Sequence, residues 1–484
     1  MGSAIEGLKP ESVWKYFEQI SKIPRGSKNE AAISRFVAQT AQKLGLEAAT
    51  DKVGNVVVRK PASKGRENAR MVCLQGHLDM VCEKNKDKAH DFLKDPIELV
   101  RKENIMMANG TTLGADNGIA VATNLALMAD NTVEHPPLEF LFTIDEETGL
   151  TGANNLEPGF LKAKTMLNLD SEEEGALYVG CSGGRDSHGH WRADSEPPPA
   201  GHVAAEVRVR GLKGGHSGLE INKGRGNAIK ILNRVLLRLA ELGGRLAAIS
   251  GGNKHNAIPR EAEALLFLPK KNLETAGQLV AQIEGVLKAE IATVDPGLTI
   301  AFEVLPKKKA KVFRRALQKK VLQTIAALPH GVIKMSADIP ELVETSTNVA
   351  VIKTDKKAVT LVTSQRSSVA SEIDDIAEMV QTVFLLGGAE IQAGDGYPGW
   401  KPNLDSEILK VAKSTSIQVF GKEPEVKAIH AGLECGIIGE KYPGMDMVSF
   451  GPTLEGVHSP DEKIYIDTVE RFWNYLLAVL KNVS

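Results

Sequence analysis

The sequence predicts an α/β protein, with a mostly parallel sheet flanked by helices and a smaller α+β domain inserted into it. Its 484 residues exceed what one hydrophobic core holds, which is roughly 250 to 300 residues. The first third alternates segments of helical period with short apolar runs. Beyond residue 183 the predicted strands instead alternate apolar with polar residues, which is typical of strands with one solvated face.

Two helices are expected first, because apolar residues recur at the helical period in 11–23 and 29–46. Short apolar runs of strand length follow. Such runs between helices indicate buried strands of a parallel sheet. These predicted strands lie at 55–60, 71–75, 138–144 and 165–169.

A turn-rich segment, 196–202, places a domain boundary near 184, and a second turn cluster at 395–403 ends the insertion. We therefore predict a catalytic domain of residues 1–183 and 397–484 and an inserted domain of residues 184–396. The insertion shows the order βαββαβ of a ferredoxin-like unit, followed by a partial second copy that suggests an internal duplication. The expected elements are strand 203–212, helix 225–243, strands within 245–268, helix 272–291, strand 297–305, helix 313–328, strands within 343–366, helix 371–387 and strand 389–393.

Composition excludes several classes of partner. The 59 basic and 61 acidic residues leave no electrostatic footprint for nucleic acid or an anionic membrane surface. The four cysteines are scattered without a CxxC pair, which is typical of reduced thiols in a cytoplasmic protein. The N-terminus lacks a signal-peptide pattern, so we expect a cytoplasmic protein with small-molecule partners.

Polar residues gather at the ends of the predicted strands. His77 and Asp79 lie two apart where the strand 71–75 ends, so in extended geometry they share one face. The crevice beyond the carboxyl ends of parallel strands is where such a sheet binds ligands. The other polar residues expected at this edge are Asp116, Glu146, Glu147, Asp170 and His458.

Each of these residues also has a simpler interpretation. Asp116 precedes a predicted helix, where an aspartate is more often an N-cap than a ligand. Glu146 and Glu147 fit a solvated loop, and Asp170 fits an exposed acidic turn. Clustered carboxylates, however, repel one another unless protons or cations neutralise them, so together with two histidines they favour a metal centre.

Two imidazoles with three carboxylates suit zinc, or cobalt or manganese as substitutes, better than magnesium. Five ligands are too many for one tetrahedral zinc with an open position. They serve two ions about 3.5 to 4 Å apart if one carboxylate bridges them. Such a pair activates a water and polarises a carbonyl, and one glutamate of the 146–147 pair is placed to collect the proton of the water.

The segments GHLDMV, GADNG, DEETG, LDSEEEG and GVHSPDE, in this order, resemble the co-catalytic zinc exopeptidases, a family that includes carboxypeptidase G, aminoacylase and carnosinase. The segments GTTLGADNGI, GLKGGHSG, NAIPRE, YPGW and HAGLECG resemble most closely the bacterial members that cleave aminoacyl-histidine dipeptides. The resemblance spans nearly the whole chain. It implies the zinc exopeptidase fold, with the inserted domain as a lid that contributes substrate contacts.

The resemblance also implies a ligand set. His77 would bind one zinc ion together with Asp170. His458 would bind the other ion together with Glu147. Asp116 would bridge the two ions.

Two further residues of the centre take roles by resemblance. Glu146 would be the general base. Asp79 would orient the ring of the metal-binding His77, which sets the tautomer of the ring and its basicity as a ligand. The peptide bond between Asp116 and Asn117 is expected to be cis.

In the inserted domain, His216 matches the histidine that donates to the developing oxyanion, although an ordinary turn histidine would fit the same segment. Asn256 and Arg366 match residues that hold the backbone and the carboxylate of the substrate. A surface arginine is the alternative for Arg366, which lies beside two serines. His430 and Glu434 are expected to line the pocket, without an assigned role.

The sequence therefore predicts a cytoplasmic two-zinc dipeptidase that hydrolyses unblocked dipeptides, with Xaa-His and β-alanyl-histidine among its substrates. An N-acyl-amino-acid deacylase or a carboxypeptidase on the same scaffold is one alternative. A metal-binding scaffold without catalysis is another, but a scaffold has no need of a general base such as Glu146. A homodimer is compatible with the resemblance, whereas the duplicated insertion predicts that His216 acts within its own chain.

Overall fold

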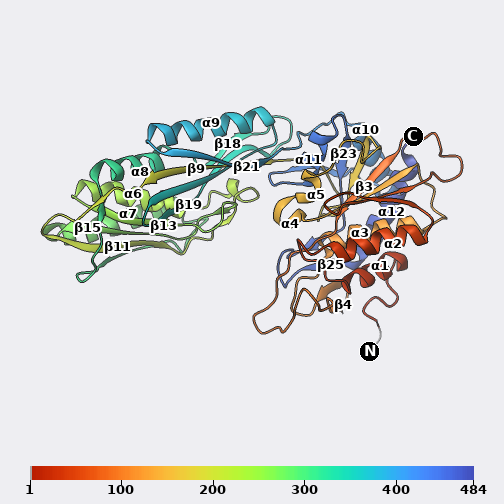
Figure 1. The fold of residues 1–484 in the computed structure, drawn as a ribbon, viewed down its shortest axis with the longest axis horizontal. Coiled ribbons are helices and arrows are strands. Elements are labelled where there is room, and N and C mark those ends of the chain that lie inside the picture. Colours follow the sequence, from red (N-terminus) through yellow and green to blue (C-terminus); the bar gives the residue numbers. More distant parts are fainter. Residues whose placement is uncertain (1–2) are drawn as a thin grey trace. The chain divides into compact units, whose positions relative to one another are not determined.

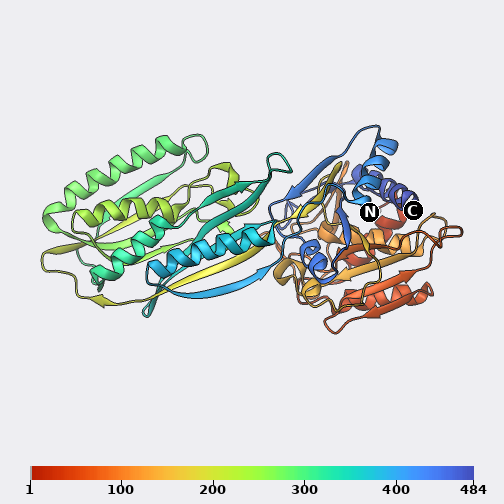
Figure 2. The same cartoon turned by 90° about the horizontal axis from the view of Figure 1, so that it is seen from above.

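The computed structural model describes residues 3–484, which divide into two compact units (Figures 1 and 2). The first unit contains the residues up to Gly180, with Trp400–Ala428 and Leu433–Ser484. The second contains Cys181–Gly399 and Ile429–Gly432. The expected boundaries at 184 and 396 lie three residues inside the ends of this second unit. Residues 429–432 belong to it because the backbone N–H of Ser182 donates to the carbonyls of Ile429 and Ala431.

The first unit is built on a sheet of the order β1-β2-β6-β3-β7-β23-β8-β22. Its central strands β6, β3, β7 and β23 are parallel, whereas β1–β2, β2–β6 and β23–β8 are antiparallel. The sheet is therefore parallel at its centre and not toward its edges. Its strands are β1 (Glu47–Thr50), β2 (Val56–Lys60), β6 (Leu138–Thr143), β3 (Val72–His77), β7 (Thr165–Asn168), β23 (Asp446–Ser449), β8 (Ala176–Cys181) and β22 (Glu425–Ile429).

Every residue of β3 and β6 is buried, as their continuous apolar runs predict. Helix α3 packs against α1 and α2, and α10 packs against α12 and β23. A small sheet of order β24-β25-β5-β4 lies in the same unit. The helices and remaining strands are α1 (Glu11–Ser21), α2 (Ala31–Lys43), α3 (Ala115–Ala129), α4 (Glu146–Gly149), α5 (Thr151–Asn154), α10 (Glu407–Phe420), α11 (Glu434–Lys441), α12 (Ile466–Asn482), β24 (Leu454–Glu455), β25 (Lys463–Tyr465), β5 (Ile105–Ala108) and β4 (Leu99–Lys102).

The second unit is one long sheet of the order β16-β11-β15-β13-β19-β20-β9-β21, with β18 paired to β19. Its first half, formed by β11, α6, β13, β15, α7 and β16, is a ferredoxin-like unit. Its second half contains α8, β19, β20, α9 and β21, and its remaining strand is β9. Strand β9 precedes the first half in the chain, so the second half, which looks partial in the sequence, is completed by a strand from upstream.

The main core of the second unit lies where α6, α7, α8 and α9 pack on this sheet, and Figure 1 shows these helices along it. Within residues 3–484 no helix combines the length and the apolar character that a membrane span needs. The elements of the second unit are β9 (Gly183–Arg192), β10 (Ser195–Glu196), β11 (His202–Arg210), β12 (Gly215–His216), α6 (Ala228–Glu241), β13 (Arg245–Gly251), β14 (Ala257–Ile258), β15 (Ala262–Pro269), α7 (Leu273–Ile291), β16 (Thr299–Val304), β17 (Val312–Phe313), α8 (Arg315–Ala327), β18 (Gly331–Met335), β19 (Val343–Thr354), β20 (Ala358–Ser367), α9 (Ala370–Leu386) and β21 (Glu390–Tyr397).

Candidate metal centre

The carboxyl ends of the parallel strands bring the predicted polar residues of the first unit together. His77 is the last residue of β3, and its Nε2 lies 3.1 Å from Oδ1 of Asp116 and 3.4 Å from Oδ1 of Asp170. Asp170 follows β7, the parallel neighbour of β3. Its side chain is only 7% exposed, so the alternative of an exposed acidic turn is wrong for this residue.

Asp116 lies between the two histidines. Its Oδ1 faces His77, and its Oδ2 lies 3.1 Å from Nε2 of His458. Although burial acts to raise the pKa of Asp116, its contacts with His458 and His77 bring that pKa well below the ordinary value. Asp116 is not an N-cap: Gly114 holds that position of α3, and the Asp116–Asn117 peptide bond is cis.

Glu147 completes the second half of the cluster. Its Oε2 lies 3.0 Å from Nε2 of His458, and its side chain is only 4% exposed, so the solvated-loop alternative is wrong for Glu147. The other oxygen, Oε1, is buried and has no hydrogen-bond partner among the described residues. A buried carboxylate oxygen without a donor is costly, and a cation would satisfy it.

Four groups of three donors among the described residues lie close enough to hold a metal ion, and two of these groups share the carboxylate of Asp116. The first is His77, Asp116 and Asp170, and the second is Asp116, Glu147 and His458. Within each set the donor atoms lie within 4.8 Å of one another. Two imidazoles and three carboxylates arranged around a shared aspartate are chemically suited to two divalent cations of the zinc type. The residues present therefore fit the predicted metals.

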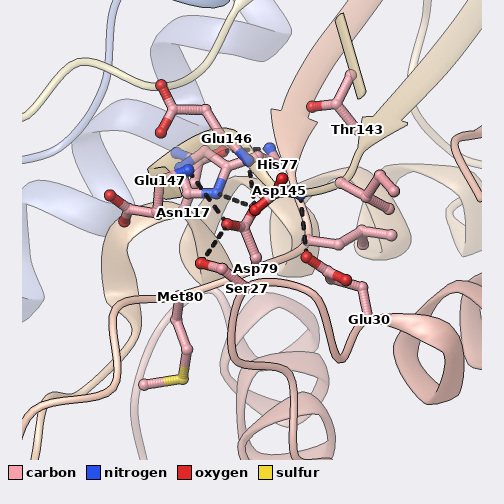
Figure 3. Close-up of polar contacts among 12 residues, drawn as sticks. Ser27, Glu30, His77, Asp79, Met80, Asn117, Thr143, Asp145, Glu146 and Glu147 are labelled. Atoms are coloured by element: carbon pink, nitrogen blue, oxygen red, sulfur yellow. Dashed lines mark hydrogen bonds and ion pairs between the residues drawn. The ribbon is translucent and has the colours of Figure 1, made fainter. Parts of the chain in front are cut away.

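Asp79 contacts both sides of the centre. Its Oδ1 lies 3.3 Å from Nδ1 of His77, the ring nitrogen that faces away from Asp116. The same carboxylate accepts the backbone N–H groups of Glu146 and Glu147, at 3.0 and 3.2 Å, and the hydroxyl of Ser27 (Figure 3). Asp79 therefore holds the ring of one candidate ligand and the backbone that carries another. The sequence pattern predicted only its contact with the histidine.

Glu146 lies beside the cluster, and in Figure 3 its carboxylate extends away from Asp79. Burial raises the pKa of Glu146 well above its ordinary value. Asp170 and Glu147 add to this effect, against the opposing charge of His77. A raised pKa is what a glutamate needs to accept a proton and release it near neutral pH.

Sequence reasoning missed two buried residues that hold the loop before α3. The carboxylate of Glu462 accepts the backbone N–H groups of residues 113–116, at 2.7 to 3.2 Å. Arg25 donates to the carbonyls of Leu78, Asp79 and Gly114. The only signal for Glu462 was its place in the HSPDE segment, and nothing in the local sequence marks Arg25 as buried.

In the second unit, β12 pairs with β14 and places His216 next to the loop of Asn256. The Nδ1 atom of His216 accepts the backbone N–H groups of Gly218 and Leu219, at 3.2 and 3.1 Å. An atom that accepts two hydrogen bonds carries no proton, so the neutral ring holds its proton on Nε2. The backbone carbonyl of Asn256 accepts the backbone N–H of Ser217, so this bond does not involve the side-chain amide of Asn256.

Arg366 is buried near the end of β20, so the alternative of a surface arginine is wrong. Its Nη1 donates to the hydroxyl of Tyr397 at 2.8 Å, and its Nε has no partner among the described residues. His430 lies 2.7 Å from the hydroxyl of Ser346. Burial, with the positive charge of Arg366, lowers the pKa of His430 to about 3, so this ring is neutral.

Glu434 belongs to the first unit and is fully buried at the start of α11. Its Oε2 accepts the side chains of Gln75 and Thr143, both at 2.6 Å. These two residues lie on β3 and β6, close to the points where His77 and Glu146 follow. Glu434 therefore holds together the strands that carry the cluster.

Comparison with known proteins identifies relatives of the whole chain. The model of the peptidase family M20/M25/M40 matches residues 73–482. The cytosol non-specific dipeptidase of Escherichia coli strain K12 is 40% identical over 482 residues, which is 99% of each chain.

Two solved structures are also similar. The aminoacylhistidine dipeptidase of Vibrio alginolyticus is 42% identical, with a TM-score of 0.90 over 100% of this chain and 98% of that one. Human carnosine dipeptidase 1 shares the fold at 14% identity, with a TM-score of 0.51 over 97% of this chain and 95% of that one.

The two faces of the His77 ring give a first prediction. His77→Ala removes the nitrogen that faces Asp116 and Asp170, so bound metal should be lost. Asp79→Ala leaves all five donor atoms, so metal should be retained while kcat falls at least about 10- to 100-fold. Metal analysis of both purified variants, with a peptidase assay, checks this. Equal loss of metal from both would contradict the role given to Asp79.

Glu462 gives a second prediction. Glu462→Ala leaves three buried and one partly buried backbone N–H group without this acceptor, so the free energy of unfolding should fall by about 3 kcal/mol or more. Urea unfolding measures it. The matched control is Glu455→Ala, which removes an exposed carboxylate paired with Lys463 and should leave stability near wild type. Equal effects of the two substitutions would show that the four contacts contribute little.

Proposed function

The chain belongs to the peptidase family M20/M25/M40, and we propose that it hydrolyses unblocked dipeptides, including Xaa-His and β-alanyl-histidine. Metal-dependent dipeptide hydrolysis is the activity supported by the dipeptidases from Escherichia coli and Vibrio alginolyticus that resemble it over their full length. The name of the Vibrio protein supports the aminoacyl-histidine substrates, and that of the Escherichia coli protein supports a broader range.

The observation that carries this proposal is the pair of donor sets that share Asp116. We infer two zinc ions, with cobalt or manganese as substitutes. One ion would be held by His77 and Asp170, and the other by Glu147 and His458. When bound, such a pair of ions supplies a water activated at neutral pH and polarises the scissile carbonyl.

The residues around the ions supply the proton transfers. Glu146 is the general base in this proposal: it takes a proton from the attacking water and passes it to the departing amine. Its raised pKa suits both steps. Asp79 fixes the backbone of Glu146 through the N–H bond to its Oδ1, so the base is held in place by the residue that orients His77.

The second unit supplies substrate contacts. His216 is proposed to donate its Nε2 proton to the carbonyl oxygen as negative charge develops there. The two backbone donors on Nδ1 favour the tautomer that this role requires. Arg366 is proposed to bind the C-terminal carboxylate, for which its buried, unpartnered Nε is available. Asn256 would hold the substrate backbone.

We also propose a cytoplasmic location, which the name of the cytosol dipeptidase of Escherichia coli supports. The duplication in the second unit supports action of His216 within one chain, without a histidine borrowed from a partner. A homodimer stays compatible with the proposal.

Glu146→Gln tests the general base. The variant keeps the size of the side chain but cannot accept a proton, so kcat should fall by about 10² to 10⁴-fold. Metal analysis should still find about two ions per chain, because Glu146 is outside both donor sets that share Asp116. A variant that loses its metal along with its activity would count against the assignment of Glu146 as the base.

A substrate panel separates the alternatives. Gly-His and β-alanyl-histidine should be cleaved, whereas N-acetyl-histidine and a longer peptide should not, because a dipeptidase needs the free amino group at a fixed distance. Product release is followed by amine detection after loading with zinc. Faster hydrolysis of the N-acetylated substrate would identify a deacylase. If none of the four substrates is cleaved, the protein is a metal-binding scaffold without catalysis.

A further inference from the structure

The second unit contains a carboxylate–imidazole pair that none of the roles above uses. Oδ2 of Asp186, on β9, lies 2.8 Å from Nδ1 of His255. The side chain of Asp186 is 19% exposed, whereas that of His255 is 61% exposed. The pair therefore joins a sheltered carboxylate to a ring that solvent reaches.

Strand register places Asp186 on the same face of the sheet as Arg366. Gly184 is paired with Arg366, and Asp186 with Ser364, two residues further along each strand. Side chains two apart on a strand share a face, and diagonal neighbours on adjacent strands lie about 7–8 Å apart. Arg366 and Asp186 are such diagonal neighbours.

The opposite face of β9 belongs to the helical core. Arg185 points that way, because its Nη1 reaches Asp374 of α9 at 2.6 Å. Ser187 is buried on the same side and donates to Gln365. Asp186 therefore faces away from α9, on the side of the sheet that also presents Arg366.

Tyr397 connects the two charged residues. It is paired with Gly184 on the other edge of β9, and its hydroxyl accepts Nη1 of Arg366. Burial raises the pKa of Tyr397. The charge of Arg366 lowers this pKa and the charge of Asp186 raises it, so both charged groups are close enough to the hydroxyl to act on it. Arg366 likewise acts on the pKa of His255, which contact with Asp186 raises.

We propose that Asp186 is a specificity residue that accepts the imidazole N–H of a C-terminal histidine in the substrate. When Arg366 binds the C-terminal carboxylate of the substrate, the side chain of the C-terminal residue extends along this face. It then points toward Asp186, the diagonal neighbour of Arg366. The contact between Asp186 and His255 is an example of the same interaction inside the protein, because there too the carboxylate faces an imidazole nitrogen. The exposed His255 ring is displaced when the substrate ring arrives.

This inference rests on the proposed dipeptidase function and on the role given to Arg366. It accounts for selectivity among dipeptides and adds no step to hydrolysis. A carboxylate at this position favours C-terminal side chains that carry an N–H donor. It gives nothing to a ring of similar shape without one, such as phenylalanine.

Asp186→Asn tests the proposal on the zinc-loaded full chain, with Gly-His and Gly-Phe as substrates. The ratio of kcat/KM for Gly-His to that for Gly-Phe should fall about ten-fold or more, because a charge-assisted hydrogen bond is lost. Most of the change should appear in KM, since the contact is made before the reaction and kept through it. Inhibition by free L-histidine should weaken in parallel.

Asp374→Asn is the matched control, because it removes an exposed carboxylate of the same unit whose partner, Arg185, faces α9. Its ratio should equal that of the wild type. His255→Ala removes the internal competitor, so its KM for Gly-His should not rise.

An unchanged ratio in Asp186→Asn, or an equal loss for both dipeptides, would show that Asp186 only anchors the loop of His255 and would overturn the proposal. Cleavage of neither dipeptide by the wild type would instead refute the dipeptidase function on which the proposal rests. Cleavage of Gly-Phe alone would leave a dipeptidase but remove the role of Asp186.

Discussion

Carboxylates that repel one another are held together at the carboxyl ends of β3, β6 and β7, and the rest of the first unit is arranged around that constraint. Asp116, Glu147 and Asp170 face only two imidazoles, and one oxygen of Glu147 has no donor among the described residues. Such a cluster is unfavourable without cations, so the same features that make it costly also make it a candidate metal centre. The sheet provides the geometry, because parallel strands end at one edge.

Buried ionic groups, together with regular structure, fix the segments that carry these candidate ligands. Glu462 binds the N–H groups of residues 113–116, where α3 begins. Arg25 links the start of α3 to the segment after β3, because it donates to the carbonyls of Gly114, Leu78 and Asp79. Asp79 holds the ring of His77 and the backbone of Glu146 and Glu147. The carboxylates of Glu462 and Asp79 accept hydrogen bonds that fix the backbone around the candidate ligands. These ligands would therefore be in place before a metal ion binds.

The second unit shows the same division between a regular scaffold and a few directed polar groups. Two ferredoxin-like halves form one continuous sheet because β13 of the first half pairs with β19 of the second. Strand β9, which comes before the first half in the chain, joins the second half between β20 and β21. Strand β9 carries Asp186 and lies between the strands of Arg366 and Tyr397, so the strand that completes the second half also brings these polar residues together. Two backbone N–H groups of its own turn donate to Nδ1 of His216 and so favour the tautomer with the proton on Nε2.

The sequence by itself determined the elements and the ligand candidates. Apolar periodicity located α1, α2 and the buried strands to within a few residues, because burial on both faces leaves a continuous apolar run. Polar residues at or just after the predicted strands placed His77, Glu147 and Asp170 together, because all parallel strands present their carboxyl ends to one crevice. The tertiary structure alone decided what depends on contacts between distant segments. Strand β9 has a polar, glycine-rich sequence without an apolar pattern, so only its neighbours β20 and β21 define it as a strand. Glu462 and Arg25 look like any surface charge in the sequence, because the N–H and carbonyl groups that they bind come from segments up to 349 residues away.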